Sequence, residues 1–323
     1  MKYLAQLDSL TGVKMKGLCT ALGLPSSGRK DFLHNQLSST LSLPPDQQTL
    51  PPSPRILSID MGLRNMAFSL LTLPKITTRS KTLPRRIHLQ AWNRLSLIPP
   101  NVLPSSEDPY SPQNMSQTAY KLITSQFLPL RPTHILIERQ RFRTRGQAAV
   151  QEWTVRVNML ESMLHAVLTS LRLEDRWPGG TLVSVNPKTV ASFYACEDEK
   201  AVKGAKRAQE IKKMKIATVA TWLKDGTKGL VLDSGEVLDM ERRFLDKFDG
   251  KRLPRRKKSD PEPTVEELRM AEERLEKIDD LADSLLQGVI WLTWQENRRM
   301  ALADGVHKLL ESGVMNSMLI DRE

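Results

Sequence analysis

The chain has 323 residues, a formal net charge of +11 and a pI near 9.7. With 40% hydrophobic and 26% charged residues, it has the composition of a globular protein, as one large domain with an appendage or as two domains. The positive charge favours a polyanionic partner, with nucleic acid ahead of a membrane surface. Two cysteines, Cys19 and Cys196, lie far apart without histidines at ligand spacing, which argues against a disulfide scaffold or a zinc site. No apolar run is long enough to span a bilayer.

The first 43 residues are expected to form two or three short helices, because leucines recur there at roughly helical spacing. The stretch GLPSSGRK breaks this pattern around Gly28, and a new helix is expected to begin at Arg29 and Lys30. The stretch resembles the SAP motif, a small helical DNA-binding module, and this resemblance implies that Arg29 and Lys30 bind DNA. The alternative is a helical hairpin packed on the main domain. With one acid and few arginines in the first 30 residues, a folded segment is a better interpretation than a mitochondrial presequence.

A proline-rich segment follows this module. Five prolines between Pro44 and Pro54 prevent both a helix and a central strand. The segment is therefore predicted to be a semi-rigid linker, which at about 3.1 Å per residue can carry the first module roughly 30 Å away. We expect a module at 1–43, a linker at 44–54 and a domain at 55–323.

The pattern from residue 55 onward is that of an α/β domain. A hairpin is expected from strands at 55–62 and 65–73. Further strands are expected at 86–95, 133–138 and 181–185, and helices at 113–128, 147–172, 187–194, 205–224 and 264–296. This is the element order of the RNase H-like fold, a mixed five-stranded sheet with flanking helices.

Residues 225–263 do not fit this order and are expected to be an insertion. They contain four glycines and the basic run KRLPRRKK at 251–258. The run is either a solvated loop or part of a DNA-binding surface.

Two predicted strands end in a carboxylate. Asp60 follows the apolar residues of the first strand, and Glu138 follows Ile135-Leu136-Ile137. A carboxylate at the end of a buried strand is costly unless it is paired or bound to a metal. Each acid alone is as well explained by a strand-end surface position, but the two together point to a shared site.

A third acidic group lies in KIDDLADSLLQGVIWL (277–292), where Asp279 and Asp280 are four and three residues before Asp283. Either pair shares one face of a helix. The alternative for Asp279 or Asp280 is that it caps the helix, but capping does not explain Asp283. Such a cluster suits phosphodiester hydrolysis with two Mg²⁺ ions, since Mg²⁺ prefers hard oxygen ligands.

Three segments together, SIDMGLRNMAFSLL, ILIERQRFRTRG and DDLADSLLQG, resemble the acidic motifs of RuvC-like Holliday-junction resolvases, in particular the fungal mitochondrial branch. The resemblance implies that Asp60, Glu138 and Asp283 are catalytic metal ligands, with Asp279 or Asp280 as the fourth. It also implies two Mg²⁺ or Mn²⁺ ions per site, a homodimer that makes paired symmetric nicks in a four-way DNA junction, and a mitochondrial location.

Basic residues cluster at three places, which predicts DNA contacts through phosphates. One cluster follows Glu138, one spans 203–215, and the third is the run at 251–258. By the resemblance, Lys188 lies near the scissile phosphate. Phe142 either stacks on an unpaired base or packs in the protein, and packing is slightly favoured. The DNA-binding candidates beyond the first module are Arg139, Arg141, Phe142, Arg143, Arg145, Lys188, Lys203, Lys206, Arg207, Lys212, Lys213 and Lys215.

The sequence therefore predicts a structure-selective endonuclease, with no membrane and no small-molecule substrate. Two alternatives remain: a non-catalytic architectural DNA-binding protein on the same fold, and a related nuclease that cuts another branched or hybrid substrate.

Overall fold

The computed structural model describes residues 2–43, 50–74, 86–98, 108–140, 150–194, 205–225, 229–250, 275, 277–311, 315 and 317–321. Several predicted DNA-binding residues lie outside this part of the chain: Arg141, Phe142, Arg143, Arg145, Lys203 and the run at 251–258. For Lys206 and Arg207, only the backbone is described.

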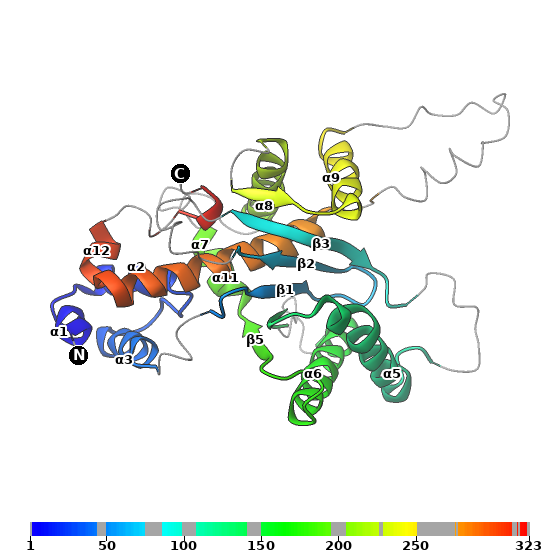
Figure 1. Cartoon of the computed structure of the whole chain (residues 1–323), viewed down its shortest axis with the longest axis horizontal. Helices are drawn as coiled ribbons and strands as arrows, with labels where there is room; N and C mark the ends of the chain where they lie inside the picture. Colours follow the sequence, from blue (N-terminus) through cyan, green and yellow to red (C-terminus); the bar gives the residue numbers. More distant parts are fainter. Residues whose placement is uncertain are drawn as a thin grey trace.

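A six-stranded mixed sheet forms the centre of the molecule, in the order β5-β4-β1-β2-β3-β6 (Figure 1). The β1–β2 and β2–β3 pairs are antiparallel, and β1–β4, β4–β5 and β3–β6 are parallel. The five predicted strands are confirmed, and a sixth was not expected. The strands are β1 (Arg55–Asp60), β2 (Met66–Thr72), β3 (Ile87–Leu95), β4 (His134–Glu138), β5 (Thr181–Val185) and β6 (Leu230–Leu232).

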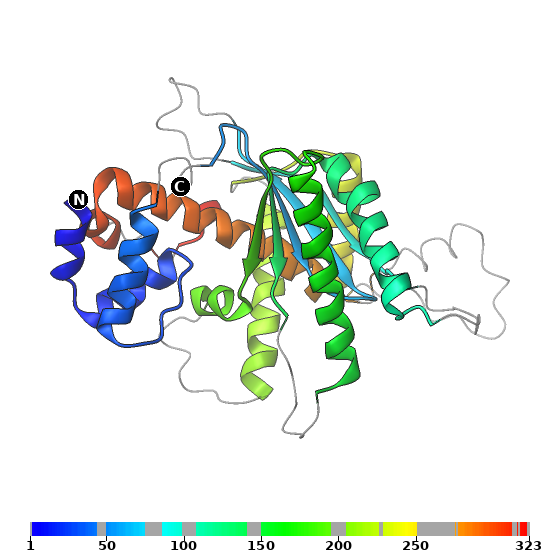
Figure 2. The same ribbon diagram turned by 90° about the horizontal axis from the view of Figure 1, so that it is seen from below.

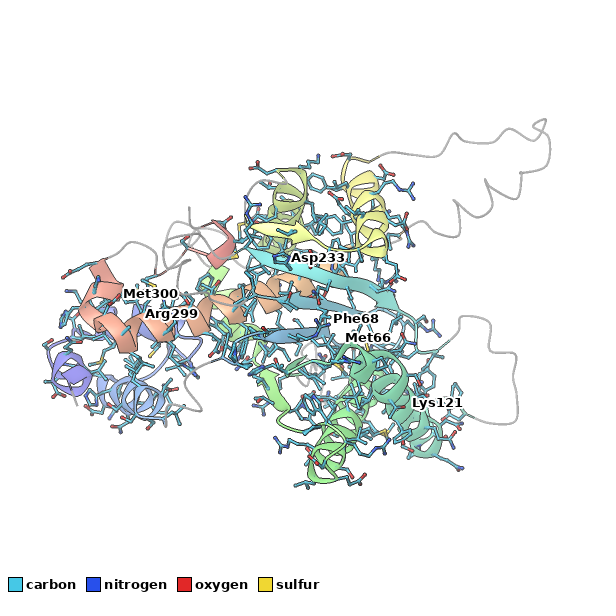
Figure 3. All side chains as sticks on the ribbon, in the orientation of Figure 1. Met66, Phe68, Lys121, Asp233, Arg299 and Met300 are labelled. Atoms are coloured by element: carbon cyan, nitrogen blue, oxygen red, sulfur yellow. The ribbon has the colours of Figure 1, made fainter. Side chains whose placement is uncertain are left out.

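Helices cover both faces of this sheet, as seen from below in Figure 2. One face packs on α5 (Pro112–Leu122), its π and 3-10 continuation (Ile123–Leu130) and α6 (Glu152–Leu173). On this face Phe68 of β2, labelled in Figure 3, meets Phe127 edge to face at 5.5 Å. The other face packs on α7 (Pro187–Tyr194), α8 (Ala205–Asp225), α9 (Gly235–Phe248) and α11 (Asp279–Asp304).

The predicted insertion at 225–263 is folded at residues 229–250, which form a strand and a helix, while its basic run lies outside the described residues. The strand β6 adds to the edge of the sheet, with Leu230 opposite Ile87. Ser234 caps α9 by accepting a hydrogen bond from the Val237 amide at 3.2 Å. The helix then buries Val237, Met240 and Phe244, which share one face at helical spacing.

The long helix α11 begins at Asp279, because residues 277 and 278 are not helical, so the prediction of one continuous helix over 264–296 is wrong. Ile278 is the N-cap residue, so neither Asp279 nor Asp280 caps the helix. The helix approaches the sheet closely at Gly288, where a Cβ would lie 2.6 Å from a Leu71 methyl group. This contact fixes the depth of α11 against β1 and β2.

Three N-terminal helices pack on the far end of α11 and on α12 (Val306–Glu311), beside Arg299 and Met300 in Figure 3. Asn297 of α11 donates to the Ala21 carbonyl at 2.7 Å, and the Val306 amide donates to the Gln6 side chain at 3.0 Å. This unit therefore packs on the domain, and a linker that holds it 30 Å away is wrong. The three helices are α1 (Lys2–Asp8), α2 (Gly12–Ala21) and α3 (Lys30–Leu41).

A short 3-10 turn, η4 (Leu319–Asp321), packs near α8, where Asp321 accepts a hydrogen bond from Trp222 at 2.9 Å. In the described part of the chain, no helix is both long and apolar enough to cross a membrane.

Candidate active site

The ends of β1 and β4 bring Asp60 and Glu138 together. Ile59 and Ile137 are partners in the parallel register, so the two acids follow side by side. Since side chains alternate along a strand, Asp60 lies on the same face as Ser58, which accepts a hydrogen bond from Gln287 of α11 at 3.1 Å. Asp60 and Glu138 both lie on the α11 side of the sheet, close enough for Glu138 to raise the pKa of Asp60.

The first turns of α11 add three more acids to this pair. Asp283 lies near Glu138, and both Asp283 and Asp280 raise the pKa of Asp60. Asp279 lies next to Asp280 and Asp283. Apolar residues on another side of the same helix are buried in the core, which turns the acidic side of the helix toward the strand ends. These core residues are Leu281, Leu285, Val289 and Leu292.

Burial raises the pKa of Asp60 well above the ordinary aspartate value, and the neighbouring Glu138 raises it further. Burial also raises the pKa of Asp280 to about 6, with a further rise from Asp279 and an opposing effect of Arg94. For Asp283, burial raises the pKa while the Lys215 ammonium opposes the rise. The carboxylates thus repel one another in a half-buried site.

Three cations border the acidic cluster. From α8, Lys215 donates to Asp283 at 2.9 Å and Lys212 forms an ion pair with Asp279 at 2.5 Å. From β3, the Nε of Arg94 lies 3.9 Å from Asp280 Oδ2. The sequence placed Lys212 and Lys215 on a DNA-binding surface, whereas their side chains reach the carboxylates. Arg94 was missed altogether.

The donor set fits a hard divalent cation, since it is made of carboxylate oxygens alone. Asp280 Oδ2 is buried and has no hydrogen-bond partner among the described residues, so the surrounding protein does not fully satisfy this carboxylate. In the described chain, however, no group of three or more His, Cys, Asp and Glu side chains is arranged to hold an ion as it stands. Two of the five carboxylates, those of Asp279 and Asp283, are directed to the ammonium groups of Lys212 and Lys215.

The other predicted DNA-binding residues lie at two places. Arg139 and Lys188 are exposed at the ends of β4 and β5, the edge that carries Glu138. Lys213 is exposed on α8. Arg29 and Lys30 are exposed at the start of α3, in the N-terminal unit, and thus belong to a separate surface.

The family model for "Mitochondrial resolvase Ydc2 / RNA splicing MRS1" matches residues 56–301. The chain belongs to this family. Within the match lie all five clustered acids and the three cations that border them. The family therefore accounts for the nuclease-like domain and not for the N-terminal helices.

Two relatives cover nearly the whole chain. The mitochondrial cruciform cutting endonuclease 1 of Schizosaccharomyces pombe is 27% identical over 289 residues, which are 87% of this chain and 91% of that protein. The crystal structure of the yeast mitochondrial Holliday junction resolvase Ydc2 matches with a TM-score of 0.58 and 25% identity, covering 92% of this chain and 98% of that one. The RNase H-like, RuvC-like fold predicted from the sequence is thereby confirmed.

Proposed function

We propose that this protein is a metal-dependent endonuclease that resolves four-way DNA junctions. The observation that carries the proposal is the cluster of Asp60, Glu138, Asp280 and Asp283 at the ends of two adjacent strands and one helix. The two relatives, named for cutting cruciforms and Holliday junctions, support the substrate. Both are named mitochondrial, and we propose the same location here.

Asp60, Glu138, Asp283 and one of Asp279 and Asp280 would hold two Mg²⁺ or Mn²⁺ ions. When bound, the ions supply an activated water and stabilise charge on the leaving oxygen. Ligation would require the Asp283 carboxylate to turn from Lys215 and, where Asp279 is the fourth ligand, the Asp279 carboxylate to turn from Lys212. The ammonium groups released in this way are then free to meet a DNA phosphate.

The remaining basic side chains orient the substrate. Exposed Arg139 and Lys188 flank Glu138 at the strand ends, where a phosphate approaching the acids would pass. Cationic contacts of this kind provide most of the affinity for a DNA backbone, but carry no catalytic proton themselves. Binding and cutting are therefore separable by mutation.

A homodimer is part of this proposal, because a four-way junction has two-fold symmetry and its resolution needs two nicks. Contact of one surface with itself is the simplest way to place two sites symmetrically. Light scattering should give twice the mass of one chain on the junction, and a monomer both free and bound would refute the dimer.

The family description also names RNA splicing, which makes a non-catalytic nucleic-acid-binding protein the second candidate. A binding role alone gives no reason to gather five acids beside a basic surface, since like charges in a buried place are costly. Cleavage is therefore the better-supported activity.

The test is Asp60→Asn. It should reduce cleavage of a four-way junction in Mg²⁺ to less than about one per cent of wild type while preserving binding, because it removes a ligand and leaves the basic surface. Asp233→Asn is the matched control: Asp233 follows β6 at the outer edge of the sheet, where it bonds His88 (Figure 3). Cleavage by Asp60→Asn at the level of that control would refute the assignment.

A further inference from the structure

A β-bulge in β3 decides which of its side chains face α11. Along the β2–β3 pair, Leu71 is opposite Leu89 but Leu70 is opposite Ala91, so Gln90 is an extra residue. Before the bulge, the odd-numbered residues Ile87 and Leu89 face the α11 side of the sheet. After the bulge, the even-numbered residue Trp92 faces that side. Without the extra residue, position 94 would face α5 and α6 instead. Bulges are often found next to active sites, where they redirect a side chain in this way.

The two redirected residues hold the first turn of α11. The Trp92 indole donates to the Leu281 carbonyl at 3.1 Å, and the guanidinium of Arg94 forms an ion pair with Asp280. They lie two positions apart on one face of β3, and their partners are adjacent residues of α11. The helix turn that bears the acids is thus fixed to the strand at two points.

Arg94 also reaches the other part of the acidic cluster. Its Nη2 donates to the side chain of Asn65, which lies in the turn between β1 and β2, directly after the strand that ends in Asp60. One guanidinium therefore links the β1 turn to α11. The planar fork of arginine can make both contacts at once, whereas the single ammonium of lysine does not match this geometry.

The contact with Asp280 is incomplete in the described structure. Arg94 Nε and Asp280 Oδ2 are both buried, lie 3.9 Å apart and have no hydrogen-bond partner among the described residues. Two unpartnered polar atoms that face each other are costly if they only maintain the fold. A small movement of the carboxylate brings them into a hydrogen bond.

We propose that Arg94 is a positioning residue for the cation site: it holds the Asp280 carboxylate, and the turn after Asp60, in the arrangement that binds the divalent ion. This rests on the proposed function for the existence of the ion site. Arg94 does not touch the ion; it acts through Asp280 and Asn65. Partners of this outer kind change metal affinity by about 10–100-fold when they are removed.

The test measures Mn²⁺ affinity by calorimetry on the full chain without DNA, for Arg94→Gln, Asp280→Asn and the double variant. Arg94→Gln should weaken Mn²⁺ binding at least about 10-fold. In the Asp280→Asn background, the same change should weaken it less than about twofold, since the group that Arg94 positions is gone. Arg94→Lys, which keeps the charge, should also bind Mn²⁺ several-fold more weakly than wild type, and this variant stands in if Arg94→Gln does not fold.

Arg55→Gln is the matched control. Arg55 is a partly buried sheet arginine at the other end of β1, bonded to Gln90 at 2.6 Å and to the Leu130 carbonyl at 2.8 Å. The substitution Arg55→Gln should lower the melting temperature and leave the Mn²⁺ affinity within about twofold of wild type, because Arg55 does not touch the acids. The proposal is overturned if Arg94→Gln and Arg94→Lys leave the affinity unchanged, or if Arg94 and Asp280 contribute independently. Since no DNA is present, these outcomes do not depend on whether the protein cuts junctions.

Discussion

Asp279 and Asp280 are neighbours in sequence but have different surroundings. Asp280 acts on the pKa of Asp60, has a buried oxygen without a partner in the described structure and faces Arg94. Asp279 is paired with Lys212, whose side chain is 52% exposed. The spacing of acids in the sequence left both possible as the fourth ligand, and these surroundings favour Asp280.

We therefore predict that Asp280→Asn is the more damaging of the two substitutions. It should reduce Mg²⁺-dependent cleavage more than about 100-fold, beyond the range expected for an outer partner, while Asp279→Asn should stay within that range. Single-turnover cleavage over a series of Mg²⁺ concentrations measures both. The reverse order would make Asp279 the ligand and Asp280 the outer acid.

A second residue-scale prediction concerns His134, on β4. Burial lowers its pKa from 6.5 to about 4, and its ring lies 5.2 Å from that of Trp291. Because the folded-state pKa lies below the unfolded value, the neutral ring contributes stability that is complete above pH 6.5 and is lost as the pH falls toward 4. We expect the free energy of unfolding to fall by about 1–3 kcal/mol over this window. This is less than the full pKa difference would give, because solvent partly reaches the ring.

His134→Phe keeps a ring against Trp291 but cannot take up a proton. Urea denaturation from pH 7.5 to 4.5 should show that wild type loses more stability than the variant, with the difference confined to this window. Parallel curves for the two proteins would show that His134 is not responsible.

At the scale of elements, the N-terminal helices are the clearest departure from the sequence prediction. The proline content predicted a linker that separates these helices from the domain. Instead, Leu33, Leu37 and Leu41 of α3 are buried in one core with Val306 and Leu309. No single-sequence pattern shows which apolar faces will meet. The likeness of this unit to a SAP module, and DNA binding by Arg29 and Lys30, stay predictions.

Deletion of residues 1–43 is therefore expected to destabilise the rest of the chain. It exposes Val306 and Leu309, which are at most 1% exposed, and burial of such side chains contributes about 1.5–3 kcal/mol each. The melting temperature should fall by several degrees, while a Val13→Ser control, at a residue 77% exposed, should leave it unchanged. If the shortened chain and the full chain have the same melting temperature, this packing contributes no stability.

The strands of the core were predictable because each is a short apolar run with turn residues at its ends. The bulge at Gln90 was not predictable, since one extra residue leaves no pattern in the sequence. Without knowledge of the bulge, Arg94 could not be assigned to the site. The insertion at 225–263 was predicted, but its strand β6 and helix α9 were not. A strand of three residues is too short to show a pattern, and the one-faced apolar spacing of α9, which does indicate a helix, was not used.

Across the whole molecule, the sequence indicated the acids of the site but not the cations that pair with them. Asp60, Glu138 and Asp283 were predictable, since acids at the ends of apolar strands and on a helix face call for a compensating charge. Lys212 and Lys215 appeared as part of a basic stretch, because sequence alone does not show that α8 crosses the start of α11. The fold thus places ammonium groups beside the carboxylates, and these groups can pass from the acids to a phosphate.

We expect this arrangement of acids and cations to cut four-way junctions. The most direct measurement incubates the full chain in Mg²⁺ with a mobile four-way junction and, in parallel, with a duplex, a flap and an RNA–DNA hybrid of equal length. We predict paired nicks at symmetric positions in two opposing strands of the junction, and far slower cutting of the other three substrates. Preferential cutting of the flap or hybrid, or no cutting of any substrate, would refute the resolution of four-way junctions by this site.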